Sequence, residues 1–142
     1  GTSPSSILTN GVYALPILAA GDVVEVEAWY TILNNSGTLR QYNLGTKLGS
    51  TTVVNPALVL SPSATPYFGF WKATIRVEGT SDLNASAYAQ ILPGATNCGA
   101  TAQTGSVDVS SSVNLDLTVT TGGAGATQTA TLQHYYLKVS KA

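Results

Sequence analysis

The strongest constraint on the fold is the alternation of apolar and polar side chains over residues 21–32. In an extended chain, Glu25, Glu27 and Thr31 lie on one side. The other side is apolar and carries Val24, Val26, Ala28, Tyr30 and Ile32. A period of two is typical of a strand with one buried face, so this segment predicts a long strand at the centre of a β-protein.

A turn signal follows this strand directly. Residues 34–37 read Asn-Asn-Ser-Gly, and these residue types tolerate a left-handed backbone. Residues 39–48 then resume the alternation, with Tyr42, Leu44, Thr46 and Leu48 on one face. We therefore predict that the two strands pair as a hairpin.

The same alternation predicts further strands at residues 12–15, 51–54, 67–78, 83–91, 106–112, 115–119 and 127–139. The last of these changes phase near Gln133 and His134, which predicts a β-bulge. Residues 55–66 and 93–105 are expected to be long connections, and residues 122–126 a glycine-rich hairpin tip. The expected fold is all-β, an antiparallel β-sandwich of jelly-roll type with about eight strands.

The length of the chain fits one domain. A chain of 142 residues buries roughly two-thirds of its unfolded surface, which is enough for one sandwich core. We expect residues 11–142 to form this domain and residues 1–10 to form a polar N-terminal arm. The predicted core residues are Val24, Val26, Ala28, Leu44, Ile75, Val77, Leu117 and Leu137.

Charged residues are scarce. Lys and Arg number 6 and Asp and Glu number 7, together 9% of the chain, with a net charge of −1, where roughly 25% charged is usual. A surface with so little charge repulsion favours close contact between subunits, so we expect self-association. The chain has no basic cluster and no apolar run near the ~18 residues of a membrane span. Neither nucleic acid nor a membrane is therefore expected as a partner.

Carboxylates that could carry catalysis are few. Glu25 and Glu27 share a strand face and could in principle supply an acid–base pair for a sugar substrate. A solvated strand face with Arg76, Lys72 or Arg40 opposite explains them without a catalytic role. We therefore predict that the protein is not an enzyme.

Signals for other catalytic or metal sites are also weak. His134 is the single histidine, and no Gly-x-Ser-x-Gly elbow precedes it, so we assign it to the bulge or to a subunit contact. Cys98 has no His or second Cys nearby and is interpreted as a loop thiol. Asp108 and Asp116 lie outside any calcium-loop pattern. We expect no metal and no cofactor.

Aromatic residues gather at the start of the strand predicted at residues 67–78. Tyr67, Phe68 and Phe70, together with Trp29, could form a platform on which a sugar stacks, as in β-sandwich lectins. Alternation places Trp71 toward the core, which favours packing in the core or at a subunit interface. Tyr67, Phe68 and Phe70 are therefore a candidate interface, and a glycan is expected as a partner only under the alternative interpretation.

Several motifs resemble those of a known family. They are L-P-I-L-A-A-G-D-V-V-E-V-E-A-W-Y at residues 15–30, the N-N-S-G turn, L-G-T-K-L-G-S-T-T at residues 44–52 and D-L-T-V at residues 116–119. In this order they resemble small jelly-roll structural proteins of tailed bacteriophages, and the resemblance covers the chain from about Leu8. It implies a trimer that either decorates and cements the capsid or forms the tip of a tail fibre or spike. The sequence shows no coiled coil, collagen-like repeat or long attachment region, which favours the capsid role.

The expected function is that of a homotrimeric capsid decoration protein on the outer surface of a virion, bound to the major capsid protein. A receptor-binding tip of a tail fibre or spike, or a carbohydrate-binding β-sandwich module, is the alternative. The arm is too short to fold alone, so we expect it to order on a neighbour's sheet edge or on the capsid. The arm residues expected to make this contact are Thr2, Ser3, Pro4, Ser5, Ser6, Ile7 and Leu8.

Overall fold

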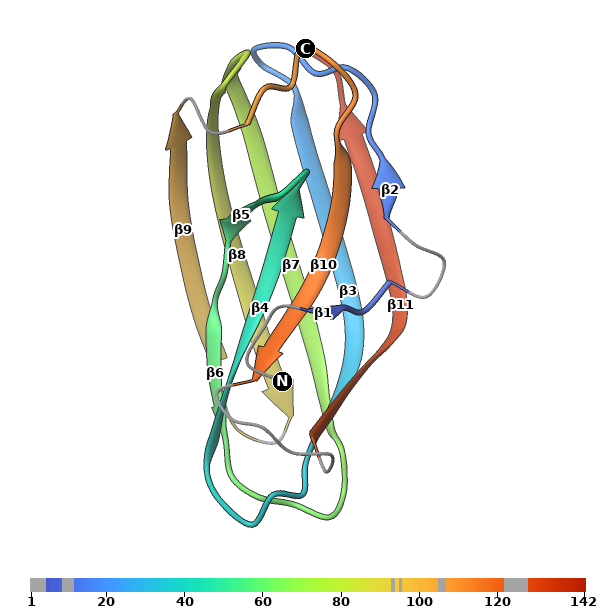
Figure 1. The fold of residues 1–142 in the computed structure, drawn as a ribbon, viewed down its shortest axis with the longest axis vertical. Coiled ribbons are helices and arrows are strands. Elements are labelled where there is room, and N and C mark those ends of the chain that lie inside the picture. The colour runs from blue at the N-terminus through green and yellow to red at the C-terminus, as the bar shows by residue number, and fades with distance from the viewer. Residues whose placement is uncertain (1–4, 9–11, 93, 95, 105–106, 122–127) are drawn as a thin grey trace.

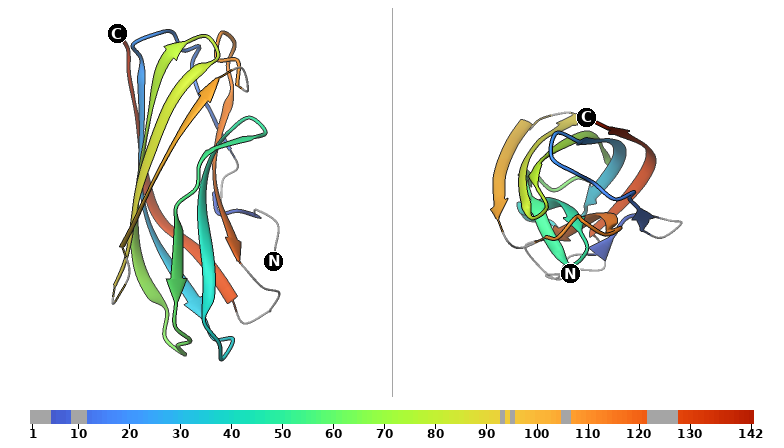
Figure 2. Two further views of the ribbon diagram at one scale, coloured as in Figure 1. Left: turned by 90° about the vertical axis from the view of Figure 1, so that its left-hand side faces the viewer. Right: turned by 90° about the horizontal axis from the view of Figure 1, so that it is seen from above.

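The computed structural model describes residues 5–8, 12–92, 94, 96–104, 107–121 and 128–142, with the backbone alone at residues 5, 96–98, 100–104 and 128. Every regular element in these ranges is a strand, and the strands form two antiparallel sheets that face each other (Figure 1; Figure 2). The predicted all-β sandwich is confirmed, with nine strands of at least four residues and two strands of two. None of the described segments forms a helix that could cross a membrane.

We call the two layers sheet A and sheet B. Sheet A has the order β1 (Ser5–Ser6), β10 (Asn114–Thr121), β4 (Arg40–Leu48) and β5 (Thr51–Val54), with β2 (Tyr13–Ala14) also paired to β10 and β6 (Ala57–Leu60) also paired to β4. Sheet B has the order β11 (Gln128–Ser140), β3 (Val23–Asn34), β7 (Tyr67–Gly79), β8 (Asp82–Leu92) and β9 (Thr96–Thr104). The long strand predicted first, β3, lies between β11 and β7 in sheet B.

The core fills the space between the sheets. Seven of the eight predicted core residues are buried, and Leu137 is half-buried against them. Tyr30 and Trp71 are the largest fully buried aromatic pair of sheet B, and their rings meet edge to face with centroids 6.4 Å apart. Burying each such ring contributes roughly 1.5–3 kcal/mol. The inward face of β8 is small-sided, and its residues Leu83, Ala85, Ala87, Ala89 and Ile91 are all buried.

The predicted bulge in the last strand is confirmed. The register between β11 and β3 shifts between Leu132 and His134, which leaves Gln133 as the extra residue. As a result, His134 pairs with Trp29, and both side chains are exposed. The bulge therefore decides which side chains of β11 reach the outer face of sheet B.

The predicted hairpin between β3 and β4 is wrong. The two strands lie in different sheets, and residues 35–39 carry the chain between them at the lower end of Figure 1. The reason lies in Asn34, whose fully buried amide donates to the carbonyl oxygens of Thr38 and Leu60, both at 3.0 Å. Asn34 thus ties the end of β3 to β6 of the other sheet, instead of starting a tight turn.

Replacing Asn34 with alanine should lower the free energy of unfolding by about 1–3 kcal/mol, because two carbonyl groups lose their donor at a buried position. Urea denaturation followed by fluorescence measures this loss. The matched control is Asn35→Ala at the exposed neighbouring position, which should change stability by less than about 0.5 kcal/mol. Equal effects of the two substitutions would show that the Asn34 amide does not hold the connection.

Both predicted long connections contain strands. Residues 55–66 include β6, which pairs with β4, and residues 93–105 include β9, which pairs with β8 and places Cys98 opposite Tyr88. Proline residues near β6 and the small polar residues of β9 hide the strand pattern in the sequence. The interpretation of Cys98 as a loop residue is therefore corrected to a strand residue.

The predicted strand at residues 106–112 is also wrong over its described part, residues 107–112. Val109 is buried, but its backbone N–H donates to the carbonyl of Thr80 (2.8 Å) and its carbonyl accepts from the N–H of Leu18 (3.1 Å). This segment therefore closes one end of the sandwich. It binds the β7–β8 connection at Thr80 and the β2–β3 connection at Leu18, and it pairs with no strand there. The predicted tip at residues 122–126 lies outside the described residues.

The inner part of the arm lies on sheet A of its own chain. Ser5–Ser6 forms β1 and pairs with β10, the N–H of Ile7 donates to the carbonyl of Leu117 (2.9 Å), and Leu8 is buried. The expectation that the arm orders only on a neighbour is therefore wrong for residues 5–8, because the edge of β10 accepts them. Thr2, Ser3 and Pro4 lie outside the described residues, and the contact of the arm with a capsid stays a prediction.

Candidate functional site

The outer face of sheet B brings aromatic side chains together from three strands. The strand registers place His134, Trp29, Phe70 and Gln90 side by side on β11, β3, β7 and β8. The Trp29 ring lies 5.2 Å from the Phe70 ring at an interplanar angle of 59°, and 5.4 Å from the His134 ring at 40°. We call His134, Trp29 and Phe70 the ring row. Tilted rings at these distances attract one another, so the row is held in a defined shape.

A hollow of about 170 Å³ lies beside the ring row. Its lining residues are Trp29, Phe68, Gly69, Phe70, Gln90 and Leu92. Phe68 is 66% exposed, Leu92 59% and Trp29 40%. Large apolar side chains that are exposed together, rather than singly, mark binding surfaces. The hollow is therefore the best-defined candidate binding site in the described part of the chain.

Hydrogen-bonding groups lie in the next row of the sheet, on the far side of Trp29 and Phe70 from Phe68 and Leu92. Lys72 and Glu27 form a half-exposed ion pair there, with Nζ and Oε1 3.7 Å apart. The hydroxyl of Tyr88 donates to Oε1 of Gln90 at 3.3 Å. The expected pairing of Glu27 with a cation across the strands is confirmed, and an exposed pair of this kind contributes at most about 1 kcal/mol.

The structure separates the predicted aromatic residues into two groups. Phe68 and Phe70 line the hollow with Trp29, as the platform interpretation expected. Tyr67 does not, because it is half-buried against the core and its hydroxyl donates to the carbonyl of Ser61 at 3.0 Å. Trp71 is buried in the core, as alternation predicted.

Sequence reasoning missed Gln90, Leu92 and the approach of His134 to this site. The parity of β8 was sufficient to find the first two, because its odd-numbered residues from 83 to 91 face inward and its even-numbered ones face outward. His134 could not be placed in this way, since its neighbour depends on the exact position of the bulge.

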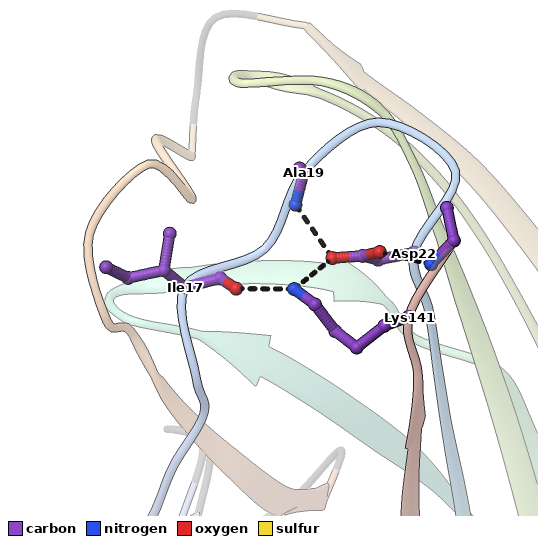
Figure 3. Close-up of polar contacts among 5 residues, drawn as sticks. Ile17, Ala19, Asp22 and Lys141 are labelled. Atoms are coloured by element: carbon purple, nitrogen blue, oxygen red, sulfur yellow. Dashed lines mark hydrogen bonds and ion pairs between the residues drawn. The ribbon is translucent and has the colours of Figure 1, made fainter.

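A second cluster of polar contacts ties the end of the chain to the connection before β3 (Figure 3). The carboxylate of Asp22, only 2% exposed, accepts hydrogen bonds from Lys141 Nζ (2.5 Å), the N–H of Ala142 (2.8 Å) and the N–H of Ala19 (2.9 Å). Lys141 Nζ also donates to the carbonyl of Ile17 at 2.8 Å. We call these contacts the C-terminal clamp.

The electrostatics of the clamp favour the charged form of Asp22. The hydrogen bond from Lys141, followed by those from the backbone of Ala142 and Ala19, lowers the pKa of Asp22 from 3.8 to about 2. Gly21 allows the close approach, because its φ is +92° and a Cβ there would lie 2.8 Å from the Cβ of Ala142. The clamp thus joins Lys141 and Ala142 to the connection before β3 around a buried, charged carboxylate.

No group of three or more His, Cys, Asp or Glu side chains suited to a metal ion occurs among the described residues. Comparisons with protein-family models, with curated proteins and with solved structures find no match for this chain.

Proposed function

We propose that this chain is a subunit of a homotrimeric capsid decoration protein of a tailed bacteriophage, with a strand order of jelly-roll type. In this role the trimer sits on the outer surface of the virion and holds neighbouring major capsid proteins together, without catalysis. The observation that carries the proposal is a set of exposed apolar side chains on and around sheet A, in a chain with 6 basic and 7 acidic residues.

These apolar side chains belong to sheet A or to connections that lead into or out of its strands. They are Val12 (47% exposed), Tyr13 (45%), Ile17 (60%), Leu39 (62%) and Val59 (53%). Few charges surround them, since the strands of sheet A contain only Arg40, Lys47 and Asp116 among their described residues. Interfaces between subunits are depleted of charge and rich in apolar contact at their centre, so this side of the domain suits a contact with another copy.

Two further parts of the proposal, the trimeric state and the location on the capsid, come from the resemblance of the sequence motifs to phage jelly-roll proteins. A trimer also explains how modest contacts could hold a capsid. Each subunit repeats the same contact, and linked contacts bind far more tightly than one alone.

A receptor-binding tip of a tail fibre or spike is the second candidate. The observation that favours it is the hollow beside the ring row, because a decoration role alone requires no such site. The two candidates share the fold and the trimer, and they differ in what the outer face of sheet B contacts.

A charge placed on sheet A should break the trimer. Val59 lies opposite Gln41 on the outer side of β6. Val59→Lys should convert trimers to monomers, because one unpaired lysine charge from each of the three chains would be buried in the interface and lose its hydration. The control is Ser86→Lys, which adds the same charge at an exposed position of sheet B and should leave the mass unchanged. Analytical ultracentrifugation measures the mass. A wild-type chain that is monomeric at all concentrations would overturn the trimer.

Binding to capsids tests the location. The wild-type protein should bind empty phage heads and raise the temperature at which they open, because a ligand stabilises the state that it binds. Removing residues 1–4 tests the outer arm without removing β1 or Leu8, and it should weaken binding. Full binding by the shortened chain would contradict the role of the arm, and a protein that ignores capsids would contradict decoration.

A further inference from the structure

We propose that the hollow beside the ring row is a carbohydrate-binding site that takes one ring of a neutral oligosaccharide. This inference goes beyond the decoration role and does not depend on it.

The rings provide the apolar half of such a site. Trp29 and Phe70 are neighbours in register on β3 and β7, and their tilt of 59° makes a corner rather than a flat surface. Phe68 and Leu92, also paired in register, form the opposite side of the hollow. A sugar ring carries C–H groups on its face, and these bear the partial positive charge that the negative face of an aromatic ring attracts.

Polar groups stand where the hydroxyl groups of a bound sugar would emerge. Gln90 lies opposite Phe70, and its Oε1 accepts from the Tyr88 hydroxyl. This contact positions the amide and leaves its N–H groups as donors for a sugar oxygen. Rings bordered by donors and acceptors match a molecule that has an apolar face and a polar rim.

The extent of the apolar surface argues against a protein partner here. A standard protein interface covers about 800 Å² on each side and 20–30 residues. On this face the row beyond Trp29 and Phe70 carries the charges of Glu27 and Lys72 between Tyr136 and Tyr88, and the rows after it carry Thr74, Ser86 and Arg76. A hollow of about 170 Å³ is also below the ~300 Å³ of sites that enclose a whole drug-sized ligand. It is therefore suited to one ring of a longer chain, bound weakly at each site.

Tryptophan fluorescence gives a direct assay, because Trp29 is exposed at the site and Trp71 is buried in the core. The probes are soluble oligosaccharides of N-acetylglucosamine, of glucose and of galactose. At least one should change the emission of the wild-type protein with a Kd between about 0.1 and 10 mM, typical of a small open site. Trp71 should contribute a constant signal.

Variants connect the binding to the hollow. Phe70→Ala should weaken binding of the same oligosaccharide at least tenfold, and Gln90→Ala should weaken it less while leaving the rings in place. Tyr136→Ala is the control, since Tyr136 is a 52% exposed aromatic residue of the same sheet that does not line the hollow; its Kd should stay within twofold. A thermal melt of each variant verifies its fold.

Two results would overturn the proposal. One is the absence of any response to all three probe series, and the other is equal binding by Phe70→Ala and the wild type. If the first result comes with a loss of the trimer in Trp29→Ala, this face is a subunit contact and the decoration role stays in place.

Discussion

Replacing Gly69 with alanine should lower the free energy of unfolding by about 3 kcal/mol, although only one methyl group is added. The new Cβ would lie 2.3 Å from Cε2 and Cζ of the Tyr30 ring. Tyr30 is 1% exposed and its ring meets Trp71 edge to face, so the ring cannot move without displacing a second buried aromatic side chain. Urea denaturation measures the loss.

The control for this substitution is in the same strand. A Cβ at Gly79 would meet its nearest atom, Cβ of Asp82, at 3.6 Å, which is an ordinary contact. Gly79→Ala should therefore be neutral or stabilise by up to about 1 kcal/mol, since alanine loses less backbone entropy than glycine on folding. A loss at Gly79 equal to that at Gly69 would show that the strand, and not the Tyr30 ring, requires glycine.

A double-mutant cycle identifies the ring as the cause. In a Tyr30→Leu background, which lacks the ring, the added cost of Gly69→Ala should fall below about 1 kcal/mol. In a Tyr30→Phe background the cost should stay at about 3 kcal/mol, because the phenyl ring keeps the atoms that clash. Tyr30→Phe alone should be close to neutral, since the buried hydroxyl has no hydrogen-bond partner among the described residues.

Replacing Asp22 with asparagine should lower Tm at pH 6 by about 5 °C or more. An amide in place of the carboxylate loses its charge and directs an N–H₂ group toward donors, which come from Lys141, Ala142 and Ala19. Asp108→Asn is the matched control, because Asp108 is exposed and accepts hydrogen bonds from the nearby Ser110. Its effect on Tm should be much smaller. Similar values for both variants would contradict a clamp that stabilises the fold.

The clamp should also make stability depend on acid pH. The pKa of Asp22 is about 2 in the folded protein and near 3.8 when unperturbed, so the unfolded chain takes up the proton first as the pH falls. The stabilisation is complete above about pH 4 and is lost as the pH falls toward 2. Thermal melts at pH 6, 4 and 2 should show the curves of the wild type and Asp22→Asn converging toward pH 2. A constant difference between them at all three values would contradict this assignment.

Much of the core could be read from the sequence. The inward residues of β3 and β7 were predicted because the direction of a side chain depends on the parity of its own strand, whatever strand lies beside it. The bulge near Gln133 was predicted for the same reason, since a change of phase within one strand is visible locally. Trp71 was placed in the core and Phe68 and Phe70 outside it by parity as well.

The pairing of strands could not be read in this way. Backbone N–H and C=O groups are the same for every residue, so alternation in β3 does not indicate whether its partner is β4, as a hairpin would require, or β11 and β7, as the structure has it. That choice depended on the buried amide of Asn34 and on the contacts of β6. It also created the candidate site, because Trp29, His134 and the β7–β8 hairpin that carries Phe70 and Gln90 are distant in sequence and become neighbours only in sheet B. Parity placed Phe70 outside, whereas the registers of three strand pairs brought Trp29, Gln90 and His134 beside it.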